Sequence, residues 1–97
     1  METKRYIVRA RGSGVWAGEI SERNSETAVT MINARRLWRW SGASSLSELA
    51  KSGVYRPQKC LFPVKVDEVY ITNVLEIITM TNDAWENIEQ VKIWTQK

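Results

Sequence analysis

The sequence of 97 residues contains no histidine and a single cysteine, Cys60. Without histidine, the chain lacks the side chain that most often serves as a general base and as a metal ligand. One cysteine can form neither an intramolecular disulfide nor a thiolate cage for a metal. These absences favour a binding protein over an enzyme, and we expect no catalytic residue, no metal and no cofactor.

The chain also lacks a long hydrophobic run, because no apolar stretch approaches the roughly 20 residues that would span a bilayer. The stretch from Met1 to Tyr6 has no apolar core of the kind found in a signal peptide. We therefore expect a cytoplasmic protein with no membrane partner. Hydrophobic residues make up 43% of the chain and charged residues 26%, a balance that predicts one folded domain over residues 1–97.

What the chain does contain is five tryptophans and an uneven distribution of charge. Residues 1–60 carry 11 basic and 5 acidic side chains (+6), whereas residues 61–97 carry 3 basic and 6 acidic side chains (−3). This division is consistent with an anion-binding face on one half, with complementarity inside the fold, or with subunits that meet head to tail.

The first half of the chain predicts a hairpin followed by a longer element. Residues 6–11 are β-rich, residues 12–14 (Gly-Ser-Gly) allow positive φ, and residues 15–20 supply the partner strand. Residues 21–26 are polar and predict a turn. Residues 27–40 fit a long strand or, over nearly the same span, a helix; the β-branched run and the Trp-x-Trp alternation favour the strand.

A short helix is predicted after this element. Ser45 and Glu48 have the spacing of a capping box, and Gly53 supplies the C-terminal stop.

The last part of the chain predicts a long strand and a second helix. Residues 64–80 alternate in polarity, and their second half is apolar on both faces, as expected of a central strand; Asn73 marks a break or bulge. Residues 84–90 predict a helix and residues 91–94 a short strand. The sum is an α+β domain with a small mixed, mainly antiparallel sheet of about five strands and two short helices.

A distinctive string covers residues 38–47 and reads Trp-Arg-Trp-Ser-Gly-Ala-Ser-Ser-Leu-Ser. Through the motif Trp-x-Trp-x-Gly-Ala-x-Ser-Leu-Ser, the chain resembles a family of small uncharacterised proteins of tailed phages and prophages, over about residues 27–95. The family has no settled activity, so the resemblance supplies no catalytic residue. It implies a phage-borne accessory protein that acts in the cytoplasm of the bacterial host.

The strongest candidate for a ligand-binding site lies within the same stretch. Guanidinium groups bind phosphate bidentately, indole rings stack on nucleobases, and the N–H groups at a helix start favour an anion. In an extended segment, positions 36, 38 and 40 share one face, and positions 35 and 39 share the other. The candidate ligand-binding residues are Arg35, Arg36, Trp38, Arg39, Trp40, Ser44 and Ser45.

A structural role is the alternative for each of these residues. Trp38 and Trp40 have the size of core residues, the arginines have Glu48, Asp67 and Glu68 as possible partners, and the serines cap the helix in either case. The sequence leaves open whether the two tryptophans are exposed or buried.

Two further segments attract attention. The Gly-Ser-Gly turn at 12–14, flanked by Arg9 and Arg11, is either a clamp over phosphates or a plain hairpin turn. The basic loop 55–60 ends at Cys60, which we interpret as a buried hydrophobe and not a nucleophile. The carboxylate pairs of the chain lack any supporting catalytic pattern.

These observations favour a non-enzymatic counter-defence protein that binds and sequesters a nucleotide-type immune signal of the bacterial host. The expected partner is an anionic small molecule, in the form of a nucleotide, and we expect a homo-oligomer with pockets at subunit interfaces. A nucleic-acid-binding protein and a protein–protein inhibitor of a host factor are the alternatives.

Overall fold

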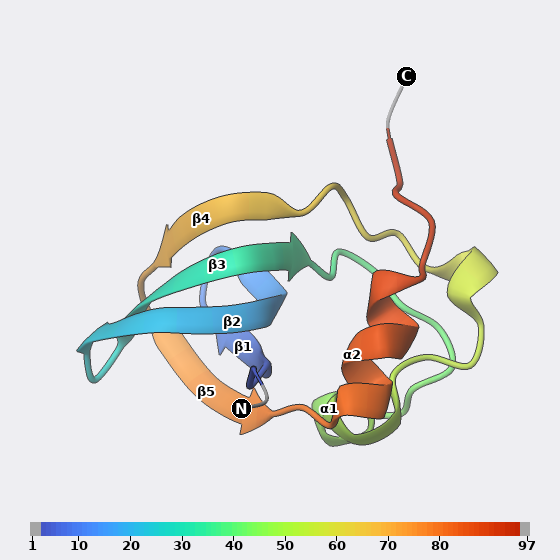
Figure 1. Cartoon of the computed structure of the whole chain (residues 1–97), viewed down its shortest axis with the longest axis horizontal. Helices are drawn as coiled ribbons and strands as arrows, with labels where there is room; N and C mark the ends of the chain where they lie inside the picture. Colours follow the sequence, from blue (N-terminus) through green and yellow to red (C-terminus); the bar gives the residue numbers. More distant parts are fainter. Residues whose placement is uncertain (1–2, 96–97) are drawn as a thin grey trace.

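One five-stranded sheet and two helices make up the computed structural model, which describes residues 3–95 (Figure 1). The predicted α+β class is confirmed. The elements in chain order are β1 (Tyr6–Ala10), β2 (Gly14–Ser25), β3 (Ala28–Arg36), α1 (Leu46–Ser52), the 3₁₀ turn η1 (Pro57–Lys59), β4 (Val66–Ile71), β5 (Val74–Thr79) and α2 (Asn82–Glu89). Within residues 3–95, neither helix is long and apolar enough to cross a membrane.

The sheet has the strand order β4-β3-β2-β1-β5, and every pairing is antiparallel. β4 and β5 are consecutive in the chain but lie at opposite edges, so the sheet curls until the two edges approach at one corner (Figure 1). Asn73 makes this corner with a positive φ of 59°. Its carbonyl accepts a hydrogen bond from Arg11 N at 2.9 Å, and Val74 N donates to Thr27 O at 2.9 Å.

The predicted break at Asn73 is therefore confirmed, but the predicted central strand is wrong. β5 is an edge strand, and its Leu75 side chain is 51% exposed. The apolar character of both faces has another cause, because Ile77 packs inside the curl and Ile78 packs toward the helices. An edge strand with an apolar cluster on each face therefore has apolar residues at successive positions, which is also the sequence pattern of a central strand.

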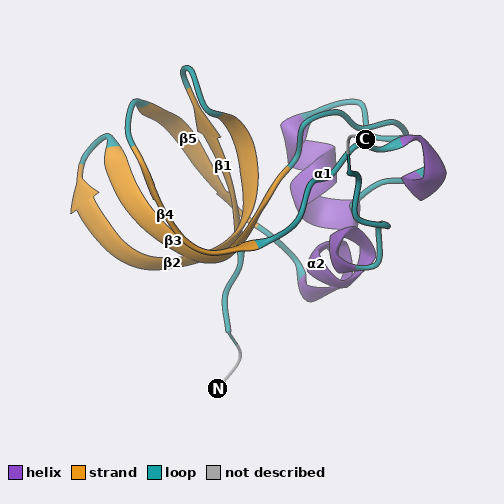
Figure 2. Ribbon diagram, turned by 90° about the horizontal axis from the view of Figure 1, so that it is seen from above, coloured by secondary structure: helices purple, strands orange, loops and turns teal. Residues whose placement is uncertain are grey.

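Two clusters of buried side chains lie on the two faces of the sheet. The curl cluster fills the inside of the bent sheet and includes Val8, Trp16 and Met31. The helix-side cluster joins the opposite face to the helices and includes Ile7 and Phe62. Figure 2 shows both helices on one side of the sheet. Successive residues of β1 therefore enter different cores.

Local sequence signals explain the helix ends. Ser45 Oγ accepts a hydrogen bond from Glu48 N at 3.2 Å, and the Glu48 carboxylate accepts one from Ser44 N. The predicted cap by Ser45 is thereby confirmed, but the reciprocal bond of the predicted capping box is displaced by one residue, because Glu48 accepts from Ser44 N and not from Ser45 N. Gly53, with φ of 79°, ends α1.

Three sequence expectations for segment ends are wrong. The predicted turn over 21–26 belongs mostly to β2, which reaches Ser25; this end of the β2–β3 ribbon is exposed, so polar residues suit it. Residues 27–40 form a strand and not a helix, but β3 ends at Arg36. Within the described part of the chain, residues 91–94 contribute a single bridge, between Phe62 and Ile93, and no strand.

Candidate ligand-binding groove

A groove of about 320 Å³ brings together two segments that are distant in the sequence, the β1–β2 turn and the end of β3. β2 places them side by side, because Trp16 pairs with Arg36 in the sheet and Leu37 N donates to Val15 O at 2.8 Å. The volume lies at the lower end of the range for small-molecule sites. The lining residues are Gly12, Ser13, Gly14, Val15, Arg36, Leu37, Trp38 and Trp40.

The turn contributes open space and unpartnered polar groups. Gly12 and Gly14 have φ values of 94° and 87°, a region that disfavours other residues, and a Cβ at either position would meet nothing within 4 Å. Ser13 Oγ is covered and has no hydrogen-bond partner. A ligand can approach this backbone closely.

Arg36 supplies the positive charge of the groove. Its guanidinium carbon lies 4.5 Å from the centre of the Trp16 ring, whose Nε1 also lacks a hydrogen-bond partner. Within residues 3–95, no carboxylate lies within ion-pair distance of this guanidinium. Stacking occupies one face of the guanidinium and leaves its N–H groups, which lie in the plane, available to an anion.

The two candidate tryptophans differ in exposure. Trp38 is 61% exposed, whereas Trp40 is partly buried and packs against the helix-side cluster. The exposure of Trp38 suits a role in ligand binding, whereas the partial burial of Trp40 suits a structural role. Trp38 offers a free ring at the rim of the groove, and Trp40 joins the groove to the core.

Arg35 lies on the opposite face of β3 from Arg36, as the alternation predicted. The predicted common face of positions 36 and 40 is wrong, because the chain leaves the strand after Arg36 and Trp40 packs against the helix-side cluster.

Arg35 is 2% exposed and donates to Pro63 O at 3.1 Å, Ile88 O at 2.8 Å and Phe62 O at 3.1 Å. Burial lowers the pKa of this guanidinium, and the charge of Glu89 opposes the shift. Through these hydrogen bonds Arg35 connects β3 with α2 and with the loop before β4. It does not line the groove.

Arg39, Ser44 and Ser45 also lie outside the groove lining. Arg39 is exposed, and its backbone exchanges two hydrogen bonds with Leu61. Both serines belong to the cap of α1, where the Ser44 N–H lowers the pKa of Glu48. The N–H groups expected to attract an anion therefore already have a carboxylate and a hydroxyl of the chain itself.

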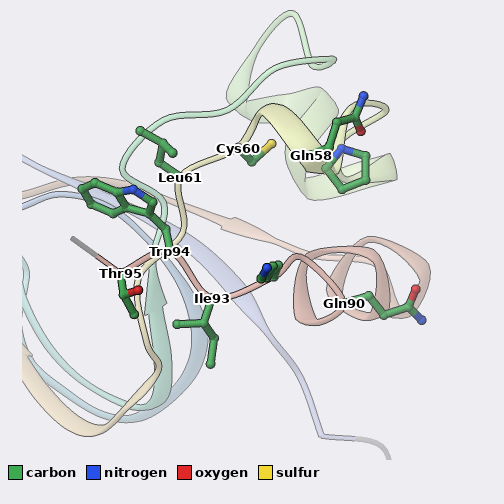
Figure 3. Close-up of a pocket in the computed structure, with 9 residues that line it drawn as sticks. Gln58, Cys60, Leu61, Gln90, Ile93, Trp94 and Thr95 are labelled. Carbon is green, nitrogen blue, oxygen red and sulfur yellow. The ribbon is translucent and has the colours of Figure 1, made fainter. Parts of the chain in front are cut away.

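A larger pocket, of about 570 Å³, was not anticipated from the sequence (Figure 3). It lies between residues 57–61, which include η1, and residues 90–95, and Figure 3 shows Leu61 next to Trp94. Cys60 is one of its lining residues and is buried as expected, with its Sγ 3.4 Å from Arg56 O. No local motif signals this pocket, because its walls come from segments about 30 residues apart that meet only in the fold.

Trp16 was the other feature that the sequence did not assign to a site. At 5% exposure Trp16 is a core residue, yet its ring also lies against the Arg36 guanidinium. The strand register that pairs Trp16 with Arg36 was the missing information. Among residues 3–95, no three Cys, Asp or Glu side chains are grouped as a metal site would require.

The fold and the groove define a small α+β domain with an aromatic–arginine groove between a hairpin turn and the end of a strand. A family model described as "Domain of unknown function (DUF6948)" matches residues 3–88, and the chain belongs to this family. No curated protein and no solved structure matches the chain significantly.

Proposed function

We propose that the protein is a non-enzymatic binder of an anionic, nucleotide-type small molecule, which it holds in the groove. The observation that carries the proposal is the arrangement of Arg36, which has no ion-pair partner within residues 3–95 and lies against an aromatic ring and beside a glycine-rich turn. A guanidinium edge suits a phosphate, and an exposed indole such as Trp38 suits a base.

An unpartnered polar atom of the groove lining supports a ligand that brings hydrogen-bonding groups. Ser13 Oγ is covered and has no hydrogen-bond partner among the described residues. A buried polar atom without a partner costs free energy, and a ligand that reorganises the turn and bonds to such an atom removes that cost. Phosphate and ribose oxygens supply suitable acceptors and donors.

The resemblance to proteins of tailed phages and prophages supports a biological setting for this binding. In that setting the protein acts in the cytoplasm of the bacterial host and sequesters a nucleotide-type signal of an immune defence, without turning it over. Closure of the groove by a second copy fits the exposed Trp38 ring, so we include a homo-oligomer in the proposal.

A thermal-shift and tryptophan-quenching titration against a panel of nucleotides tests the proposal. At about 100 times Kd, a bound ligand adds about 2.7 kcal/mol of stability, which raises Tm by roughly 10–20 °C for a domain of this size. Arg36→Ala and Trp38→Ala abolish most of the shift. Lys51→Ala is the matched control, because Lys51 is an exposed cation that does not line the groove.

A flat response across the panel contradicts the proposal, as does an equal loss of the shift in the Arg36→Ala and Lys51→Ala variants. The exposed Trp38 also favours one other function, the inhibition of a host protein, because exposed tryptophans are frequent anchors of protein interfaces. A Trp38-dependent host partner in a pull-down, together with a flat nucleotide panel, would favour that function.

A further inference from the structure

Two loops next to the groove run side by side and extend its surface. The backbones of Arg39 and Leu61 exchange hydrogen bonds of 3.3 and 2.8 Å, and Tyr55 N donates to Gly42 O at 3.3 Å. Gly42 makes the contact possible, because a Cβ there would lie 2.7 Å from Tyr55 N. Both loops belong to the part of the chain between the end of β3 and the start of β4, on the right of Figure 1. The backbone around Tyr55 therefore lies beside the segment that contains the groove tryptophans.

These loops belong to the most basic stretch of the chain. Residues 35–65 contain seven Lys and Arg but one acidic residue, Glu48, whose carboxylate accepts the Ser44 N–H. Arg35 is buried and Lys65 pairs with Glu89 at 2.8 Å. The remaining cations form no ion pair within the described part of the chain; they are Arg36, Arg39, Lys51, Arg56 and Lys59.

The same stretch presents the two most exposed aromatic side chains among residues 3–95, Tyr55 at 74% and Trp38 at 61%. Exposed aromatic rings among unpaired cations are the combination that binds single-stranded nucleic acid, since bases stack on the rings and phosphates meet the cations. Tyr70 provides a contrast within the molecule. It is 60% exposed, but it lies on β4 with the acidic residues Asp67 and Glu68.

We propose that the nucleotide ligand of the groove is a single-stranded oligonucleotide whose chain continues from the groove over the loop surface. One base and its phosphate lie at Trp38 and Arg36, and the next base stacks on Tyr55. The following phosphates lie near Arg39, Arg56 and Lys59. This inference rests on the proposed function, which it deepens by naming the ligand class.

Fluorescence anisotropy with labelled DNA and RNA of about eight nucleotides tests the inference, with a mononucleotide and a poly-glutamate peptide as competitors. For four neutralised phosphates, the slope of log affinity against log salt is about −2.8, or a loss of roughly 50-fold between about 50 and 200 mM salt. Arg56→Ala/Lys59→Ala reduces this slope to about −1.4. Tyr55→Ala weakens binding about 5-fold or more.

Matched controls remove the same chemistry from other surfaces. Tyr70→Ala removes an exposed ring from the acidic edge strand, and Lys4→Ala/Arg23→Ala removes two exposed cations outside the loop surface. Both controls bind the oligonucleotide with an affinity close to that of the unaltered protein. The mononucleotide and the peptide compete only weakly.

The outcomes separate this inference from the proposed function. If a mononucleotide binds as tightly as the oligonucleotide, and the variants at 55, 56 and 59 bind normally, the inference is overturned while the groove function stands. Equal competition by the acidic peptide overturns the inference as well, because it would show attraction by charge alone. If no nucleotide of any length binds, both proposals fail.

Discussion

Arg35→Met is a direct test of how this small fold is held together. The substitution keeps a long apolar side chain at a position that is 2% exposed, but it removes the guanidinium. Three hydrogen bonds are lost, to the carbonyl groups of Phe62, Pro63 and Ile88. These bonds connect the middle of the sheet with α2 and with the loop that precedes β4.

The magnitude follows from the partners of those carbonyl groups. Hydrogen bonds from a charged donor contribute about 1.5–3 kcal/mol each. Two of the carbonyls keep another donor, because Ile88 O also accepts from Val91 N and Phe62 O accepts from Trp94 N. Burial of the charge, which lowers the pKa of Arg35, offsets part of the gain. We expect a net loss of about 2–3 kcal/mol, or roughly 10–20 °C in Tm.

The neighbouring arginine provides the matched control. Arg36 is only partly buried and lies over Trp16, so Arg36→Met removes a cation–π contact that contributes about 0.5–1 kcal/mol. Urea unfolding followed by circular dichroism compares the two variants. Equal losses of stability, or a loss below about 0.5 kcal/mol for Arg35→Met, would refute the assignment of Arg35 as a structural clamp.

Other predictions concern the caps and the sheet. The pKa of Glu48 in the folded state lies below its ordinary value of 4.5. The carboxylate therefore contributes stability above pH 4.5, and this contribution is lost as the pH falls through the lowered pKa. In acid unfolding titrations, Glu48→Gln removes this part of the pH dependence of stability. Gly18→Ala places a Cβ 2.8 Å from Ala34 Cα and costs about 1–3 kcal/mol in urea unfolding, and an unchanged midpoint would contradict the close packing. Thr81→Ala removes the cap of α2, seen as a bond from Ala84 N at 3.0 Å, and lowers stability by about 1 kcal/mol in thermal unfolding.

Local signals in the sequence predicted local structure well. The Ser45 cap of α1 and the break at Asn73 depend on a few adjacent residues, and both are present in the fold. The alternation also predicted that Arg35 and Arg36 lie on opposite faces of β3, and they do. What the alternation did not show was which face is buried, because the acceptor Ile88 O lies 53 positions away along the chain.

Long-range pairing explains the remaining errors. The apolar second half of the segment 64–80 indicated burial on both faces. The strand order shows the reason, because β5 crosses to the far edge of the sheet and contributes side chains to both apolar clusters. The groove likewise requires two candidate segments to meet. The sequence identified the turn at 12–14 and the Arg-x-Trp-x-Trp segment separately, and the register of β2 brings them together.

The order of strands in the sheet also determines when the domain can fold. Of the five strands, β1 is synthesised first and its neighbour β5 is synthesised last, and the Arg9–Glu76 contact joins residues 67 positions apart. Pairings of such long range form slowly. Until residues 74–79 leave the ribosome, the outer edge of β1 has no partner strand. Folding of the β1–β2 hairpin into its final place is therefore coupled to the synthesis of β5, and a nascent chain that stalls before β5 exposes an edge prone to aggregation.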